Sequence, residues 1–84
     1  MFTLDHATLQ STWRIAAVHA PAAAPEWADW LRELGFLPGE PVRVMARAAG
    51  GDPIVVRVGT STFALRCAEA ACIEVIALTR EQAP

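Results

Sequence analysis

The nine residues at positions 34–42, LGFLPGEPV, constrain the fold most, because the spacing of apolar residues changes across them. Before this stretch, apolar residues recur at helical spacing, at positions 27, 30, 31 and 34. After it, they alternate with polar residues, at positions 42 and 44, as in a strand with one buried face. The stretch is therefore predicted to be a corner between a helix at 25–34 and a strand at 41–48.

The glycines and prolines of this corner have predicted structural roles. Gly35 follows the last helical residue, where a left-handed residue commonly ends a helix, and Phe36 can then pack back onto the last turn. Pro38 and Gly39 are typical of a tight turn, because proline fixes φ at one position and glycine permits a positive φ at the next. We expect these residues to shape the chain rather than to bind a ligand.

Four further short segments predict strands, at 12–20, 53–58, 62–66 and 73–78. Asp52 and Pro53 mark the turn before the second of these segments, and residues 67–71 form a single helical turn at most. Five short strands with one helix inserted after the first predict a mainly β fold, a small antiparallel barrel. In the first three strands the alternation predicts shared faces for Trp13, Ile15 and Ala17, for Val42, Val44 and Ala46, and for Ile54, Val56 and Val58.

Length and charge limit the class of protein. The 84 residues make one domain, with a barrel core expected at about 12–78 and a flexible tail at 79–84. All 7 basic residues are arginine and the formal net charge is −2, whereas nucleic-acid binders carry a basic excess. The sequence shows neither a signal peptide nor an apolar run of the ~20 residues that a membrane span needs, so we expect a cytoplasmic protein. Cys67 and Cys72 are too few for a disulfide framework and fit a reducing compartment.

Three segments together resemble a known family. LRELGFLPGEPVRV at 31–44, GDPIVVRVGT at 51–60 and FALRCAEAACIEV at 63–75 are similar, in this order and spacing, to the three sequence blocks of the ferrous iron transport protein A (FeoA) family. The resemblance covers about residues 12–78. It implies an SH3-like barrel in a bacterial cytoplasm, with no catalytic activity and no cofactor. Trp30 stands where the family often has arginine.

The resemblance also implies a partner, the membrane ferrous iron transporter of the same operon (FeoB), whose cytoplasmic region binds and hydrolyses GTP. It implies no binding to nucleic acid and no insertion into the membrane. FeoA-type domains also form the C-terminal domain of metal-dependent repressors. The alternative function is therefore a metal-responsive or effector-sensing domain of that kind.

Metal-binding and nucleophilic residues are few and scattered. Pairing of either cysteine with a histidine would be needed for a nucleophile, and small buried cysteines in a turn are commoner. His6 and His19 are the weak metal candidates, with carboxylates at Asp5, Asp52, Glu69 and Glu74, none at a recognised ligand spacing. The open alternative is a weak or metal-bridged homodimer, in which one of the histidines and a carboxylate share an ion between two copies. We commit to no metal site.

An interaction surface is the favoured hypothesis for the binding residues. If 41–48 and 53–58 pair as a hairpin, a mixed set of arginine, methionine and aliphatic residues shares its outer face, as interfaces favour. The alternative is an ordinary solvated strand face. Of the two helix tryptophans, we expect Trp27 to be fully buried and Trp30 to be partly exposed. The predicted partner-binding residues are Trp30, Arg43, Met45, Arg47, Val55 and Arg57.

Overall fold

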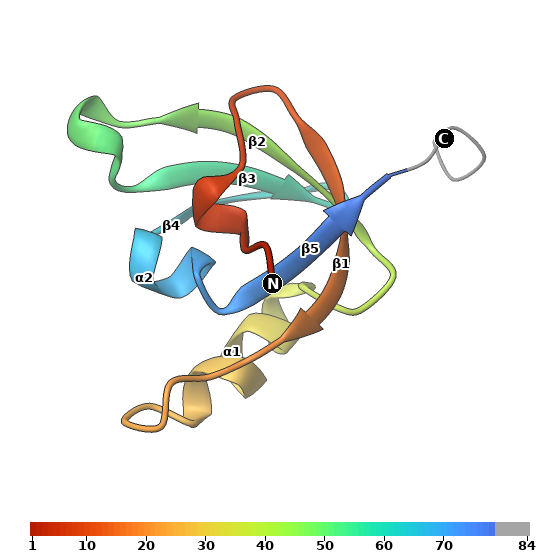
Figure 1. The fold of residues 1–84 in the computed structure, drawn as a ribbon, viewed down its shortest axis with the longest axis vertical. Helices are drawn as coiled ribbons and strands as arrows, with labels where there is room; N and C mark the ends of the chain where they lie inside the picture. Colours follow the sequence, from red (N-terminus) through yellow and green to blue (C-terminus); the bar gives the residue numbers. More distant parts are fainter. Residues whose placement is uncertain (79–84) are drawn as a thin grey trace.

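The computed structural model describes residues 1–78, so the predicted flexible tail at 79–84 lies outside the described residues. All five predicted strands, the helix and the short helical turn are present (Figure 1). Two short 3-10 helices, η1 and η2, were not predicted. The elements in chain order are η1 (Leu4–His6), β1 (Thr12–Val18), α1 (Glu26–Leu34), β2 (Pro41–Arg47), η2 (Ala49–Gly51), β3 (Ile54–Val58), β4 (Ser61–Leu65), α2 (Cys67–Ala70) and β5 (Ile73–Ala77).

The strands form one antiparallel sheet in the order β4-β3-β2-β1-β5. The sheet curls around its buried face, with α1 at one end and α2 between β4 and β5 (Figure 1). Within residues 1–78 the outer strands β4 and β5 do not pair, so the barrel-like sheet is not closed by hydrogen bonds. None of the helices in this part of the chain has the length and apolar character needed to cross a bilayer.

Two irregularities in register change which side chains face inward. In β1 the register with β5 shifts between Ile15 and Ala17, and in β2 the register with β3 shifts between Val44 and Ala46. An extra residue in one strand of a pair reverses the alternation beyond it. The prediction that Ala46 shares the buried face of β2 with Val42 and Val44 is therefore wrong, because Ala46 is exposed. In β1 the predicted face of Trp13, Ile15 and Ala17 does not continue past the shift, because the buried residues are Ile15 and Val18.

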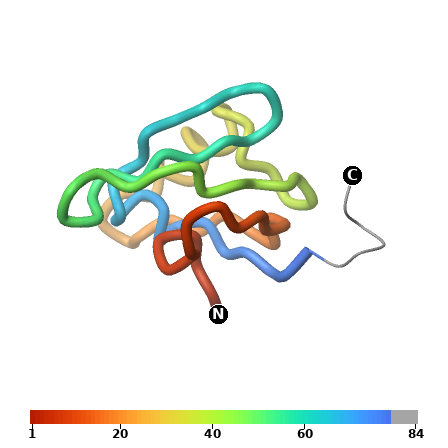
Figure 2. The backbone as a smooth tube through the Cα atoms, turned by 90° about the horizontal axis from the view of Figure 1, so that it is seen from above, coloured from red at the N-terminus to blue at the C-terminus, as the bar shows by residue number. Residues whose placement is uncertain are grey.

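The N-terminal segment adds backbone hydrogen bonds to β5 and to β2. It lies between the β2–β3 hairpin and β5 in both views (Figure 1, Figure 2). The amide of Val75 donates to the carbonyl of Phe2 over 2.9 Å, and the amide of Gln10 donates to the carbonyl of Val44 over 2.8 Å. Leu4 is fully buried, so the core begins well before the expected start at residue 12.

The corner at 34–42 has the predicted geometry. Gly35 is left-handed, with φ 118°, and the amides of Gly35 and Phe36 donate to the carbonyls of Arg32 and Leu31 over 3.0 and 3.1 Å. This pair of bonds ends the helix as a Schellman motif and places Phe36 in the core, where it is fully buried. Gly39, with φ 92°, then completes the turn with Pro38. The fully buried side chains of the core are Leu4, Ile15, Leu31, Phe36, Val42, Val44, Ile54, Val56, Leu65, Ile73 and Val75.

We predict that Gly35→Ala lowers the free energy of unfolding by about 1 kcal/mol. A Cβ at this position would lie 3.8 Å from Cγ1 of Val58, an ordinary contact, so the cost comes from the left-handed backbone rather than from a clash. Urea denaturation at 25 °C measures the change. Gly35→Asn is the matched control, because asparagine tolerates this conformation better, and alanine as stable as asparagine would contradict the account.

Candidate partner-binding surfaces

The outer face of the β2–β3 hairpin carries a row of polar residues. Arg43 lies opposite Arg57 in the ladder, and the row continues to Thr12 on β1 and Thr62 on β4. Residues directly opposite one another in an antiparallel pair point to the same face of the sheet. Two arginines and two threonines therefore share one face, which we call the outer face. Val55 lies opposite Ala46, so it belongs to this face as well.

The two arginines of the outer face differ in how they are held. The Arg43 guanidinium donates to Thr12 Oγ1 over 3.0 Å and to Gln10 Oε1 over 2.8 Å. Arg57 is exposed, and the structure of residues 1–78 gives its side chain no hydrogen bond or ion pair. Both line a hollow of about 180 Å³. Because like charges directly opposite repel, an anionic group bound there would be stabilised by both guanidinium groups.

Arg47 does not belong to the outer face, contrary to the sequence-based expectation. Beyond the register shift it lies opposite Ile54, a fully buried residue, so its side chain turns to the inner side. Its Nη2 donates to the carbonyls of Asp5 and Ala7 over 2.7 and 2.8 Å. Arg47 is thus a structural clamp on the N-terminal segment. Met45, at the register shift, is half-buried.

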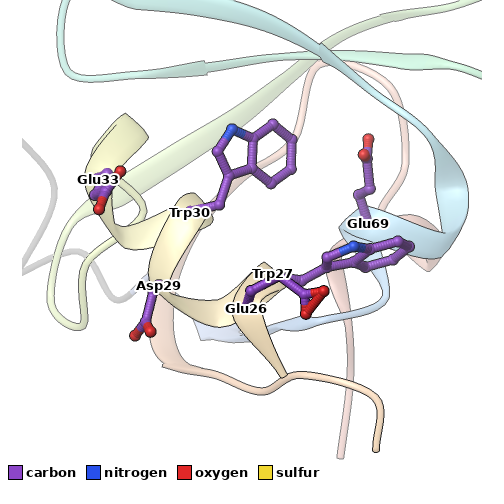
Figure 3. A pocket seen from close by; sticks show the side chains of 6 residues that line it. All are labelled: Glu26, Trp27, Asp29, Trp30, Glu33 and Glu69. Carbon is purple, nitrogen blue, oxygen red and sulfur yellow. The ribbon is translucent and has the colours of Figure 1, made fainter. Parts of the chain in front are cut away.

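Trp30 is also separate from the outer face, since it lies on α1 and lines a pocket between α1 and α2 (Figure 3). In this view the Trp30 indole and the Glu69 carboxylate stand on either side of a gap, and the Trp27 indole lies below Glu69. The pocket holds about 560 Å³. Its lining residues are Glu26, Trp27, Asp29, Trp30, Glu33 and Glu69, and we call it the α1–α2 pocket.

The two tryptophans differ in burial in the predicted order. Trp30 is 39% exposed, as expected for the outer of the two indoles. Trp27 packs against the core but is only partly buried, so the expectation of full burial was wrong. The helix is short and one side of Trp27 faces the pocket, which leaves part of that indole accessible.

Glu69 also has a structural role at the start of α2. Its Oε1 accepts a hydrogen bond from the backbone amide of Arg66 over 2.8 Å, and Asp52 Oδ1 accepts one from the amide of Cys67 over 3.0 Å. These two carboxylates satisfy amides that a helix start leaves without partners. Glu69 is therefore linked to Arg66 through the backbone amide of Arg66. Asp52 is, as predicted, a structural residue next to Pro53.

The candidate metal ligands come together only in pairs. His19 Nε2 lies 2.8 Å from Glu74 Oε1, and His6 Nε2 lies 3.4 Å from Asp5 Oδ2. Among residues 1–78, no three His, Cys, Asp or Glu side chains are grouped so that they could hold one ion. A metal ion shared between two copies of the chain stays a prediction.

The cysteines have the environment of structural residues. Burial raises the pKa of the Cys72 thiol, and the nearby charges of Glu69 and Asp5 raise it further. A raised pKa favours the protonated thiol, which is a poor nucleophile and a poor metal ligand. Cys67 Sγ lies 3.2 Å from the carbonyl of Gly51, as a thiol donor would.

The acidic residues of the α1–α2 pocket were missed as a group by the sequence analysis. Glu26 and Asp29 were recognisable as acids in the first turn of α1. Positions 26, 29, 30 and 33 fall at i, i+3, i+4 and i+7, which places them on one side of the helix. That spacing was the available signal, but Glu69 reaches the same pocket from α2, about forty positions along the chain, where spacing gives no guide.

A family model and the solved structures both match this chain to the same family. The family model described as the FeoA domain matches residues 2–77. Among solved structures, FeoA of Stenotrophomonas maltophilia in complex with zinc is 39% identical, with a TM-score of 0.84, and the alignment covers 90% of this chain and 91% of that chain. That protein is described as an SH3 domain protein and was suggested to be an activating factor of bacterial ferrous iron transport.

Two further structures extend the comparison. Iron(II) transport protein A of Clostridium thermocellum is 31% identical, with a TM-score of 0.78, over 92% of this chain and 46% of that chain. A manganese-dependent transcriptional repressor is 23% identical, with a TM-score of 0.78, over 92% of this chain and 41% of that chain, a likeness that shows the fold alone. A comparison with functionally curated proteins finds no match.

Proposed function

Because the chain belongs to the FeoA family, we propose that it is an accessory protein of ferrous iron uptake. In this proposal it binds the cytoplasmic GTPase region of the membrane ferrous iron transporter, FeoB, and modulates its activity. The observation that carries the proposal is the family match over residues 2–77, together with 39% identity to an SH3 domain protein suggested to activate ferrous iron transport.

The outer face is the surface proposed for this contact. It presents Arg57, which has no hydrogen-bond or ion-pair partner in the described part of the chain, and Arg43, which Thr12 and Gln10 already orient. Val55 supplies an aliphatic area next to the arginines. Arginine beside apolar area is the composition of interface hot spots, and two guanidinium groups favour an acidic segment of the partner.

We propose binding rather than catalysis as the activity. The buried Cys72 thiol has a raised pKa and so lacks the character of a nucleophile. The histidine side chains are engaged with Glu74 and Asp5 near the surface. These features support an adaptor role, because neither histidine is placed to act as a base for the Cys72 thiol.

The test is a calorimetric titration of this protein into the purified cytoplasmic GTPase region of its own organism's ferrous iron transporter, with a guanine nucleotide present. We expect saturable heat, and Arg57→Glu should raise the Kd by at least about tenfold, or 1.4 kcal/mol. Arg57 is the residue to reverse because its exposed side chain makes no hydrogen bond or ion pair to any of the residues 1–78, so the fold should be unaffected.

Arg66→Glu is the matched control, since Arg66 is exposed but lies at the start of α2, away from the outer face. An equal loss for both variants would indicate a general charge effect rather than this surface. Absence of heat at about 100 μM of each protein, in the presence of nucleotide, would overturn the proposed contact.

A further inference from the structure

We propose that the α1–α2 pocket is a second recognition site, which binds an arginine side chain on a segment of a partner protein. This inference is independent of the proposed function, because the pocket shares no lining residue with the outer face. Three features of the pocket favour such a ligand: its charge, its indoles and the absence of a basic residue in its lining.

The charged residues that line the pocket are all acidic. Four carboxylates line it, on Glu26, Asp29, Glu33 and Glu69, while the whole chain has a formal net charge of only −2. Arg32 pairs with Asp29 over 3.2 Å, at an exposed position. For Glu26 and Glu33 the structure of residues 1–78 gives no hydrogen bond or ion pair. Glu26 and Glu33 therefore add negative charge to the pocket lining that no residue in this part of the chain neutralises.

The indoles define the kind of cation. The Trp30 indole and the Glu69 carboxylate stand on opposite sides of the gap, and the Trp27 indole lies below Glu69 in this view (Figure 3). A cation against an indole face is stabilised by about 0.5–1 kcal/mol at an exposed site. A planar guanidinium can stack on an indole and donate to a carboxylate in the same position, which a compact ammonium does less well. The geometry thus favours arginine over lysine.

Glu69 has capacity for this second interaction. Its Oε1 accepts from the amide of Arg66, which orients the carboxylate, and an ionised carboxylate offers about four acceptor sites. Arg66 itself does not line the pocket, and neither does any other basic residue within 1–78. The Glu69 carboxylate is therefore held in place to accept from a guanidinium, and no arginine among residues 1–78 lines the pocket. Asp29 and Glu33 point away from the gap and add a negative rim (Figure 3).

The probe is the capped pentapeptide Ala-Ala-Arg-Ala-Ala, titrated to about 20 mM and followed by the three indole N–H signals in ¹H–¹⁵N NMR spectra. We expect saturable shifts of the Trp27 and Trp30 signals with a Kd in the millimolar range. The Trp13 signal is an internal control, because that indole stacks on Phe2 outside the pocket. The matched peptides carry lysine or glutamine in place of arginine, and the expected order of affinity is arginine, lysine, glutamine.

Two variants locate the site. Glu69→Gln removes the charge and keeps an amide oxygen that can still accept from the Arg66 amide, so it should raise the Kd at least about fivefold with the fold unchanged. Trp30→Ala should do the same, and Glu40→Gln, an exposed acid away from the pocket, should not. Equal shifts with the glutamine peptide, or unchanged affinity in both pocket variants, would overturn the proposal.

Discussion

Replacement of Phe36 by alanine is expected to lower the free energy of unfolding by about 3–5 kcal/mol. The ring is fully buried and packs against Phe63, with ring centroids 5.6 Å apart. Its removal deletes buried apolar area and leaves a cavity where α1, the corner and the sheet meet. For a domain of 84 residues, a total stability of about 4–12 kcal/mol is ordinary. Urea denaturation followed by far-UV circular dichroism measures the loss, and the variant should be largely unfolded at 37 °C.

The adjacent residue provides the control for this prediction. Leu37 is 43% exposed, so Leu37→Ala should cost less than about 1 kcal/mol. The two substitutions remove similar chemistry one residue apart, on opposite sides of the corner. Comparable losses for the two variants would mean that the corner does not direct Phe36 into the core.

Replacement of Arg47 by methionine is expected to cost about 2–3 kcal/mol. Methionine keeps much of the aliphatic length and removes the guanidinium, which donates to the carbonyls of Asp5 and Ala7. These carbonyls lie at the end of η1, and without Arg47 they lose a charged donor in a partly buried position. Because Arg47 ties this segment to β2, the N-terminal segment should detach first, and Leu4 would then leave the core. Urea denaturation gives the magnitude, and hydrogen exchange of the amides near η1 shows where the loss occurs.

Arg57→Met is the matched control for Arg47→Met. The two arginines are on neighbouring strands, but Arg57 is exposed and bonds to no other residue among the 78 that the structure describes, so its replacement should change stability by less than about 0.5 kcal/mol. If the Arg47 variant were equally stable, the clamp on the N-terminal segment would not contribute to stability.

The order of elements was predictable from sequence because their signals are local. Gly35, Pro38 and Gly39 act through their own backbone conformations, and the helix spacing before them needs no knowledge of the rest of the fold. The SH3-like character followed from the FeoA resemblance and is confirmed by the comparisons.

The binding surfaces were predictable only in part, because they depend on register. Strict alternation placed Arg47 with Arg43 and Arg57, but the shift between Val44 and Ala46 turns Arg47 inward. A register shift of this kind depends on pairing with another strand, so no pattern within β2 alone signals it. Trp30 was grouped with the strand residues because sequence gives composition and exposure but not which exposed residues are neighbours.

The pairing of β1 sets the order in which the fold can be completed. β1 comes first in the chain, yet it lies between β2 and β5, and Ile15 pairs with Val75, sixty positions further along. The β2–β3–β4 meander uses neighbouring segments, so it can form as soon as those residues are available. During synthesis β1 can pair with β2, but its other side and the N-terminal segment next to Val75 stay without a partner strand until β5 has left the ribosome. The first residues to be made are thus among the last to reach their places, and the apolar side of β1 that faces β5 remains exposed in the nascent chain until then.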